Sequence, residues 1–242
     1  MADNKALIVV GQGAAGLAAS LSAAETAKRH GVPLNVTLID KAPAAEAGGN
    51  TRWTPSYMRM AAVDRVEPSF VHDMLEATRF KGDETYFATL AHQAPATMKW
   101  IASHGVPFHQ PTYYLAKGPP RIQPVGGGET IHRELSRAAE NAGVKFRYSC
   151  AADEFVREKD AVTGIRLTSG EILPAHAIVL ACGGFLGIEQ AAIEIARLLA
   201  EARASGRQHG DSRGDGHAPD GACADGARHS ARTLWMLEPH GD

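Results

Sequence analysis

The sequence predicts an α/β fold with a parallel sheet, and three features of its 242 residues support that prediction. A short apolar run ends in a glycine and leads into a helical pattern and a second strand pattern, all within residues 5–40. Short alternating segments between residues 145 and 175 are typical of a small antiparallel meander. A later apolar run, residues 175–185, has the composition of another buried strand. We therefore expect a parallel sheet that is interrupted by a small antiparallel crossover.

The overall composition is that of an ordinary soluble globular protein, with 44% hydrophobic and 21% charged residues. The length is sufficient for one large domain, or for one domain and part of a second. A formal net charge of −2 provides no electrostatic surface for nucleic acid or for an anionic membrane. The expected partners are therefore small molecules, with no nucleic acid among them.

The cysteines and histidines predict neither a disulfide framework nor a metal site. Cys150, Cys182 and Cys223 are odd in number and form no CxxC pair, and the scattered histidines form no HxxxH or HExxH pair. No apolar segment approaches the roughly 18 residues of a membrane span, and the N-terminus lacks the layout of a signal peptide. A reducing, cytoplasmic location is the expectation that follows.

The first elements form a predicted βαβ unit of about thirty residues. Residues 5–10 are rich in Ile and Val and predict a buried parallel strand. Residues 14–30 predict a helix because apolar side chains recur on one face, and Gly31 is a natural C-terminal cap. Residues 35–40 alternate apolar and polar positions and predict the second strand.

The middle of the chain predicts helices that are separated by glycine- and proline-containing loops. Residues 46–53 form a glycine-containing loop, and residues 68–79 and 84–104 have helical patterns. Residues 105–125 contain five prolines and predict irregular or short extended structure. Residues 126–143 predict a glycine turn followed by an amphipathic helix.

Shorter, strand-like segments follow this helix. Segments 145–150, 153–158, 161–169 and 171–175 are separated by turn signals, and we expect them to pair as an antiparallel meander. The next apolar run, residues 175–185, ends in a Gly-Gly turn and predicts a strand of the parallel sheet.

A glycine pattern, Gly11-x-Gly13-x-x-Gly16, joins the first strand to the first helix. Gly11 permits the tight turn, Gly13 lets the backbone approach a pyrophosphate, and Gly16 allows close packing of the helix on the strand. A phosphate is then bound at the helix N-terminus, where N–H groups and the macrodipole favour negative charge. This context predicts a dinucleotide-binding, Rossmann-like domain; the alternative is a chance glycine pattern in a βαβ unit.

Two further features distinguish between dinucleotides. Asp40 ends the second strand 24 residues beyond Gly16, where a carboxylate can bind ribose hydroxyls and would repel a 2′-phosphate. The loop Gly48-Gly49-Asn50-Thr51 follows, and a nicotinamide-binding fold needs no second glycine turn there. A flavin that lies extended across the domain does need close backbone donors. The loop therefore favours a flavin, with a plain surface turn as the alternative.

Two more glycine segments lie further along the chain. Gly126-Gly127-Gly128 predicts a turn that starts a helix, and the alternative role is a backbone approach to the flavin. Ala181-Cys182-Gly183-Gly184 ends a buried strand, where ligands of α/β sheets bind. We expect Cys182 to be a small buried packing residue and not a nucleophile, because no base lies near it in the sequence.

Taken together, these motifs resemble the flavoprotein family of fumarate reductase and succinate dehydrogenase, and within it the tricarballylate dehydrogenase-like members. The resemblance covers residues 5 to about 186 and rests on VVGQGAAGLAAS, LIDKAP, GGNTRW, GGGETIHREL and AIVLACGGF. It implies a three-layer FAD-binding domain whose N-terminal portion is residues 1–186. It also implies oxidation or reduction of a C–C bond next to a carboxylate, with tricarballylate- or fumarate/succinate-like substrates and a separate electron acceptor.

The resemblance also implies which residues bind FAD. They are, for the pyrophosphate, Gly11, Gly13, Ala14, Ala15 and Gly16; for the adenosine, Asp40, Lys41, Ala151 and Ala152; for the ADP half, Ala181, Cys182 and Gly183; and for the ribityl chain and ring, Gly48, Gly49, Asn50 and Thr51. Members of the family usually have Thr in place of Cys182. Some membrane-bound members attach the flavin through a His in the loop matched by residues 48–54. No His is present in this loop, so non-covalent FAD is expected.

Residues 187–242 do not resemble the family's continuation, in which a capping domain supplies substrate-binding groups. Residues 188–204 predict a helix, whereas residues 206–232 contain no Val, Ile, Leu, Phe, Tyr, Trp or Met and predict disorder. We therefore expect a chain that is truncated or frame-shifted after about residue 186 and lacks the capping domain. A natural divergent tail is the alternative.

Three classes of function follow from these observations. The expected one is an FAD-dependent dehydrogenase or reductase of di- or tricarboxylates, with ketosteroid dehydrogenation as a related option. A nicotinamide-dependent dehydrogenase is the second, and the second glycine loop disfavours it. The third is an inactive FAD-binding fragment. The sequence assigns no catalytic residue.

Overall fold

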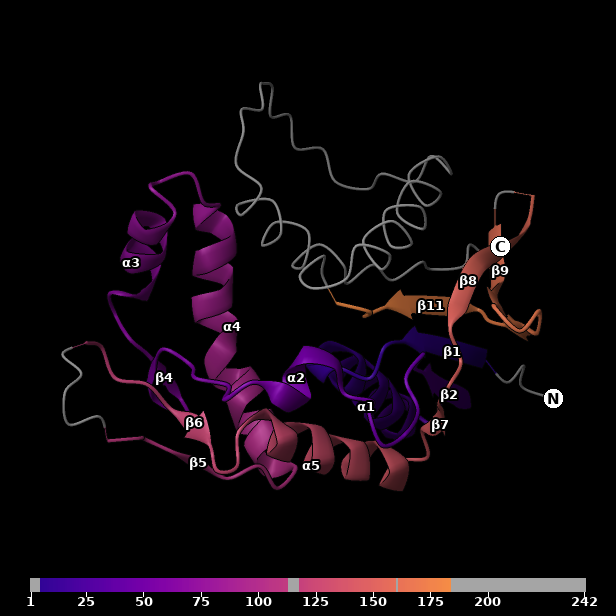
Figure 1. Ribbon diagram of the computed structural model, residues 1–242, viewed down its shortest axis with the longest axis horizontal. Helices are drawn as coiled ribbons and strands as arrows, with labels where there is room; N and C mark the ends of the chain where they lie inside the picture. The colour runs from indigo at the N-terminus through magenta and orange to yellow at the C-terminus, as the bar shows by residue number, and fades with distance from the viewer. Residues whose placement is uncertain (1–4, 113–117, 160, 184–242) are drawn as a thin grey trace. The chain divides into compact units, whose positions relative to one another are not determined.

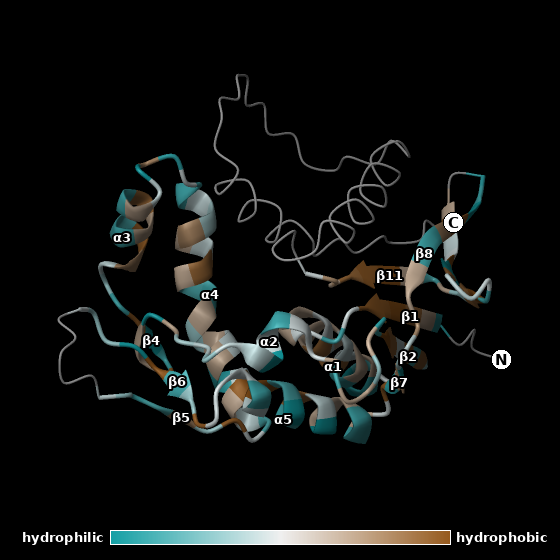
Figure 2. Cartoon of the chain, viewed as in Figure 1, coloured by the Kyte–Doolittle hydropathy of each residue, from teal (hydrophilic) through white to brown (hydrophobic). Residues whose placement is uncertain are grey.

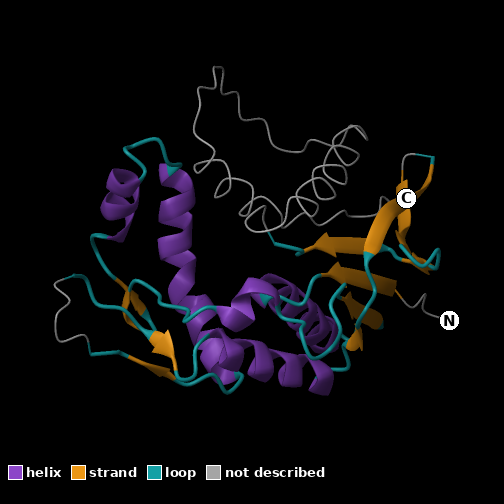
Figure 3. Cartoon of the chain, in the orientation of Figure 1, coloured by secondary structure: helices purple, strands orange, loops and turns teal. Residues whose placement is uncertain are grey.

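The computed structural model describes residues 5–112, 118–159 and 161–183, and the chain divides into two compact units. Residues 1–47 and 142–242 belong to the first, which we call the sheet unit, and residues 48–141 form the second, the helical unit. Figure 3 shows the longer strands in the sheet unit and most of the helices in the helical unit. The helix expected at 188–204, and the tail that contains it, lie outside the described residues.

The sheet unit is built on a four-stranded parallel sheet with the strand order β11-β1-β2-β7. Its strands are β1 (Lys5–Val10), β2 (Leu34–Ile39), β7 (Lys145–Arg147) and β11 (Ala177–Leu180). Val10 pairs with Ile39 on one side and with Leu180 on the other, so these strands end at the same edge. β1 and β11 are largely hydrophobic along their length (Figure 2), as expected for strands covered on both faces.

Helix α1 (Ala14–His30) covers one face of this sheet (Figure 1). Its side chains Leu17 and Leu21 are fully buried, and each contributes about 1.5–3 kcal/mol of apolar burial. The helix ends at Gly31, whose φ of +65° is left-handed and whose N–H donates to the carbonyl groups of Ala27 and Lys28. The predicted βαβ unit and its glycine cap are therefore confirmed.

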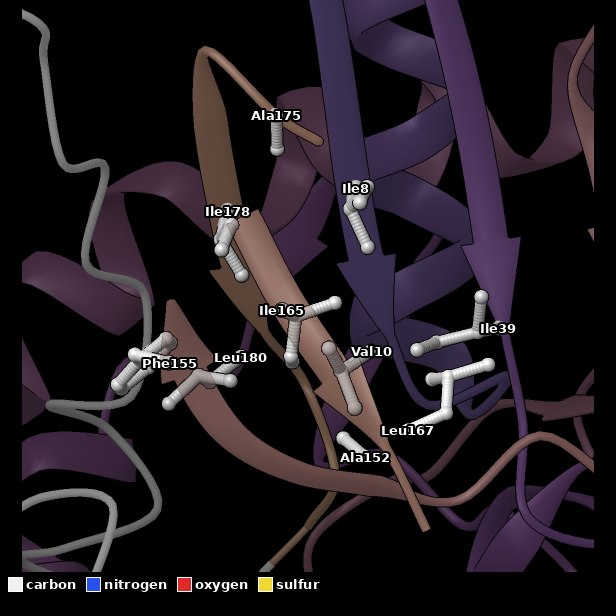
Figure 4. Packing of buried hydrophobic residues seen from close by; sticks show 10 residues of the cluster. All are labelled: Ile8, Val10, Ile39, Ala152, Phe155, Ile165, Leu167, Ala175, Ile178 and Leu180. Carbon is white, nitrogen blue, oxygen red and sulfur yellow. The ribbon is translucent and has the colours of Figure 1, made fainter. Parts of the chain in front are cut away.

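The opposite face of the sheet is covered by an antiparallel meander, β8 (Ala152–Glu158), β9 (Ala161–Leu167) and β10 (Ile172–Pro174). Figure 4 shows the apolar core between the two sheets, which includes Ile8, Val10, Phe155, Ile165, Ile178 and Leu180. The sheet unit is thus three layers: a helix, a parallel sheet and the crossover. The predicted α/β, Rossmann-like architecture is confirmed, and none of the described residues forms a capping domain.

The expectation that residues 145–150 join the meander is wrong. Residues 145–147 form β7 and pair in parallel with β2, through Thr37, Leu38 and Ile39. A segment this short has no periodicity that distinguishes a parallel sheet from an antiparallel one, so the error arises from tertiary pairing.

The helical unit contains two long helices and several short elements. They are α2 (Gly49–Trp53), β3 (Met60–Ala62), β4 (Arg65–Val66), α3 (Phe70–Ala77), α4 (Glu84–Ser103), β5 (Phe108–His109), β6 (Gln123–Pro124) and α5 (Gly128–Asn141). Asp83 caps α4 by accepting a hydrogen bond of 3.0 Å from the N–H of Tyr86. A small core forms around Met60, Met98 and Ile122.

The expected loop at residues 46–53 is in part a helix, because α2 occupies Gly49–Trp53. This short helix packs against α5, a contact that local sequence cannot reveal. The three longer helices expected in this part of the chain, at 68–79, 84–104 and 126–143, are present as α3, α4 and α5. α4 begins at the expected residue and ends one residue early, whereas both ends of α3 and α5 lie two residues inside the expected ranges.

Candidate dinucleotide-binding site

The turn between β1 and α1 is too tight to accept a side chain at its first glycine. Gly11 has a φ of +102°, and its N–H donates to the carbonyl of Ile39 at 2.8 Å. A Cβ at Gly11 would lie 2.6 Å from the carbonyl oxygen of Ala181. The turn is therefore enclosed by the ends of β2 and β11, and only glycine fits there.

The first turn of α1 is also shaped by the absence of a side chain. A Cβ at Gly16 would lie 1.8 Å from the carbonyl oxygen of Gly11, so the helix can approach the strand only with glycine at this position. Gly13 caps the helix without a side-chain hydrogen bond, and the first turn contains no acidic residue. The neighbouring Ala14 and Ala15 are small. This helix end suits an anionic group such as a pyrophosphate.

Asp40 lies beside this turn, at the end of β2. Its Oδ2 accepts a hydrogen bond of 2.8 Å from the N–H of Gln12, and its Oδ1 accepts one of 2.8 Å from the N–H of Ala42. Each oxygen of an ionised carboxylate has a further acceptor site. The carboxylate is thus oriented by two backbone groups and can still accept hydroxyl groups. The next residue, Lys41, is exposed.

The connection from β7 to β8 runs along the same segment. The N–H of Asp40 donates to Arg147 at 2.9 Å, and the carbonyl of Asp40 accepts from Cys150 at 2.8 Å. These bonds place Ala151 and Ala152, the predicted adenine contacts, directly after the residue that is bonded to Asp40. The structure therefore brings the expected adenosine residues together at one edge of the sheet.

An ion pair fixes this connection to the meander. Arg147 donates two hydrogen bonds to the carboxylate of Glu171, at 2.8 and 2.6 Å. These bonds hold the pKa of Glu171 below its usual value and raise the pKa of Arg147. Both side chains are partly exposed, so the pair orients the segment more than it stabilises the fold.

The end of β11 completes this edge. The N–H of Ala181 donates to the carbonyl of Val10 at 2.8 Å, and Ala181 is buried. Cys182 is exposed, so the expectation of a buried packing residue is wrong. Its position two residues beyond the end of β11, where the strand pairing has stopped, explains this exposure.

In the helical unit, the two predicted glycine segments are neighbours although they are far apart in the sequence. Gly48 has a φ of +120°, and a Cβ there would lie 2.9 Å from the ring of His132. A Cβ at Gly128 would lie 1.8 Å from the carbonyl oxygen of Thr51. Gly49, Asn50 and Thr51 form the first turn of α2, so the loop presents backbone N–H groups of a helix start.

An open pocket of 570 Å³ lies within the helical unit, next to these glycines. Its lining includes Arg52, Trp53, His109, Gln123 and Glu129 together with Gly126 and Gly127. Arg52 donates to Glu129 at 2.7 Å and lies over the ring of Trp53. Sequence reasoning missed the ion pair and the position of His132, and no local pattern indicates either contact.

The described part of the chain provides neither a membrane span nor a metal site. None of its helices is long and apolar enough to cross a membrane. Likewise, residues 5–112, 118–159 and 161–183 contain no cluster of three or more histidine, cysteine or acidic side chains arranged to bind a metal ion.

The geometry fits the ADP half of an FAD molecule at the edge of the parallel sheet. A Cβ at Gly11 or Gly16 would be blocked by backbone atoms, so glycine at both positions allows the tight turn and the close helix packing of a dinucleotide-binding fold. The oriented Asp40 carboxylate lies beside the turn, where the adenosine ribose follows the pyrophosphate.

Comparison with known proteins supports this assignment. A family model described as the FAD binding domain matches residues 6–239. This match extends into residues 187–239, which the motifs predict to be a non-family tail and which lie outside the described residues.

Individual relatives are reductases. The chain is 26% identical over 205 residues to vinyl phenol reductase of Lactiplantibacillus plantarum, covering 76% of this chain and 38% of the relative. It is 31% identical over 199 residues to urocanate reductase of Eggerthella lenta, covering 74% of this chain and 31% of the relative. The structure of the open conformation of a flavocytochrome c3 fumarate reductase is similar, with a TM-score of 0.58 and 26% identity over 75% of this chain and 34% of that one.

The chain thus spans about a third of the length of the curated relatives it matches. The family match, however, includes almost all of its 242 residues, and the cofactor it specifies is the one that the glycine turn and Asp40 fit. The chain therefore belongs to the FAD binding domain family, as a relative of the fumarate reductase flavoproteins.

Proposed function

We propose that this chain is the FAD-binding part of an oxidoreductase that acts on a C–C bond next to a carboxylate. Fumarate, urocanate and vinyl phenol, the compounds named for its relatives, each contain a carbon–carbon double bond in conjugation with an electron-withdrawing or aromatic group. The proposed substrates are fumarate/succinate- or tricarballylate-like carboxylates. A separate electron acceptor or donor and a cytoplasmic location complete the proposal.

The residues at the edge of the sheet would bind the ADP half of FAD. Backbone groups of Gly11–Gly16 would hold the pyrophosphate, Asp40 would accept the ribose hydroxyls with Lys41 beside it, and Ala151 and Ala152 would contact the adenine. Ala181, Cys182 and Gly183 would close over this half.

The family resemblance assigns further contacts with the flavin to the second glycine loop. The N–H groups of Gly48, Gly49, Asn50 and Thr51 would lie along the ribityl chain and ring. Residues 48–54 contain no histidine, so the flavin would be held without a covalent bond. When bound, FAD supplies the hydride acceptor or donor, and the residues named here bind and orient it.

One observation carries the proposal. The carboxylate of Asp40 accepts the N–H of Gln12, inside the same turn in which a Cβ at Gly11 or Gly16 would be blocked. The blocked positions hold α1 close against the turn, as the glycine turn of a dinucleotide-binding fold requires, and the oriented carboxylate lies beside that turn. A plain surface turn requires neither feature.

The experiment has two steps. The purified chain is incubated with FAD or NAD and passed through a desalting column, and retained cofactor is measured by absorption. Retention of FAD alone supports the proposal, whereas retention of NAD alone supports the nicotinamide alternative. Bound FAD is then reduced anaerobically, and its reoxidation by fumarate, urocanate and aconitate is followed, with succinate as the saturated control.

Reoxidation by an unsaturated carboxylate, and not by succinate, is the expected result. A chain that binds FAD and is reoxidised by none of the compounds contradicts the proposed activity. That result supports the alternative, a FAD-binding chain without catalysis.

A further inference from the structure

Gln12 is an unusual residue within the β1–α1 turn. Its neighbours in the turn are glycine and alanine, whereas its own long polar side chain is only 1% exposed. A buried amide is costly unless it is hydrogen-bonded. Here the Nε2 of Gln12 donates to the hydroxyl oxygen of Tyr148 at 3.2 Å. The turn is thus connected through a side chain to the segment that follows β7.

The same residue connects the turn to Asp40 through its backbone. The N–H of Gln12 donates to Oδ2 of Asp40 at 2.8 Å. The bond from the Gln12 side chain to Tyr148 and the bond from its backbone to Asp40 are therefore made by the same residue. Tyr148, Gln12 and the carboxylate of Asp40 form one hydrogen-bonded chain.

The position of Tyr148 is itself well defined. The residues on either side of it are bonded to the segment that begins at Asp40: Arg147 accepts from Asp40, and Ser149 donates to Ala42 at 3.0 Å. The Tyr148 ring is stacked on that of Phe146, with centroids 6.3 Å apart. A hydroxyl group held by a fixed backbone and a stacked ring is a suitable anchor for Gln12.

We infer that Tyr148 is a positioning residue for the adenosine half of the cofactor, acting through Gln12 on the carboxylate of Asp40. This inference rests on the proposed function. It adds two residues, Gln12 and Tyr148, that no glycine or acidic motif indicates. It also specifies which half of FAD they affect, because Asp40 lies at the ribose end of the site.

The test compares FAD with FMN, which contains the ring, the ribityl chain and one phosphate but no adenosine. Dissociation constants for both flavins are measured by fluorescence for the wild-type chain and for Tyr148→Phe, Gln12→Met and the double variant. Tyr148→Phe retains the stacked ring and removes only the hydroxyl group. Tyr86→Phe, an exposed tyrosine on α4, is the matched control.

We expect Tyr148→Phe and Gln12→Met each to weaken FAD binding roughly three- to tenfold, the effect of one hydrogen bond. FMN binding stays unchanged, whereas the unfolding midpoint without flavin falls in Tyr148→Phe, because this variant leaves the buried Gln12 amide without the bond to Tyr148. The double variant is no weaker than either single variant, because both remove the same bond. Tyr86→Phe binds both flavins as the wild type does.

Several results would overturn the inference. FAD affinity that is unchanged in Tyr148→Phe shows that the hydroxyl group positions nothing. Equal weakening of FAD and FMN indicates a general structural role, and additive effects in the double variant show that the two residues act separately. A wild-type chain that binds no FAD overturns the proposed function and this inference with it, whereas the first three results leave the proposed function intact.

Discussion

The two units contain the same structural device in different settings. In each, a glycine near the start of a helix lies very close to a backbone carbonyl group. A Cβ added to that glycine would lie only 1.8 Å from the carbonyl oxygen. In the sheet unit the glycine is Gly16 and the carbonyl belongs to Gly11, in the same turn. In the helical unit the glycine is Gly128 and the carbonyl belongs to Thr51, in a distant part of the sequence. The first contact is local and can be predicted from a motif, whereas the second is tertiary and cannot.

The surroundings of the two glycines also differ. Gly16 is enclosed by strands that are almost fully buried, with Val9, Leu38 and Ile39 each 0% exposed. Gly128 faces a five-residue helix whose last residue, Trp53, is 73% exposed. A rigid neighbour cannot move to accept a new side chain, but an exposed short helix can. The same substitution should therefore cost more in the sheet unit.

The largest expected effect is that of Gly16→Ala. The added Cβ meets a backbone oxygen that cannot shift without separating α1 from β1, so we expect a loss of more than about 3 kcal/mol in the free energy of unfolding. FAD retention should be lost as well. Urea unfolding followed by circular dichroism measures the first effect, and flavin absorption after desalting measures the second.

Gly118→Ala is the control for this substitution, since a Cβ at Gly118 meets no atom within 4 Å. It should unfold and bind FAD as the wild type does. A Gly16→Ala chain with wild-type stability would show that the helix and strand are not in close contact.

Gly128→Ala should have a smaller effect, about 2–3 kcal/mol on the free energy of unfolding, because α2 can move away from α5. Thermal unfolding monitored by the fluorescence of Trp53 and Trp100, both in the helical unit, is the appropriate measurement. If Gly128→Ala proves as damaging as Gly16→Ala, the argument from the mobility of α2 is wrong.

Asp40→Asn tests the function of the sheet edge and not its packing. The substitution removes the charge and leaves only one oxygen for the two backbone N–H groups, so we expect roughly tenfold weaker FAD binding and a loss of about 1 kcal/mol in the free energy of unfolding. Titration of FAD by fluorescence quenching measures the affinity. Asp64→Asn, at an exposed aspartate in the helical unit, is the control and should bind FAD normally. Equal affinity in the two variants would remove Asp40 from the site.

The smallest expected effect concerns pH. The bidentate bond to Arg147 lowers the pKa of Glu171 from its ordinary value of 4.5. The pair therefore stabilises the folded state at neutral pH, and this contribution is lost as the pH falls below 4.5 and through the lowered pKa. Urea midpoints measured between neutral and acidic pH should fall less steeply for Glu171→Gln than for the wild type. Parallel pH profiles would indicate that the ion pair is fully screened by solvent.

Much of the sheet unit could be predicted from the sequence because its signals are local. A buried strand, a glycine turn, a helix with Gly31 as its cap and a strand ending in Asp40 all lie within forty consecutive residues. The glycines of the turn and Asp40 are neighbours in the structure for the same reason. The late strand β11 was recognisable from its apolar composition alone.

The remaining features depend on contacts between distant residues. The pairing of β7 with β2, the helical turn at Gly49–Trp53 and the contact of Gly48 with His132 all require segments that are far apart in the sequence. The exposure of Cys182 depends on where β11 ends relative to the sheet edge. The bond between Gln12 and Tyr148 joins a residue that follows β1 to a residue that follows β7, 136 positions apart in the sequence. Periodicity and motifs carry no information about such contacts.

The central claim is that the β1–α1 turn and Asp40 form a binding site for FAD. It is tested most directly by the visible spectrum of the folded chain after incubation with FAD and gel filtration, alongside Gly16→Ala. The account predicts a flavin band that elutes with the wild-type protein, is released on denaturation and is absent from the variant. A folded wild-type chain that retains no flavin, or a Gly16→Ala chain that retains as much as the wild type, would contradict it.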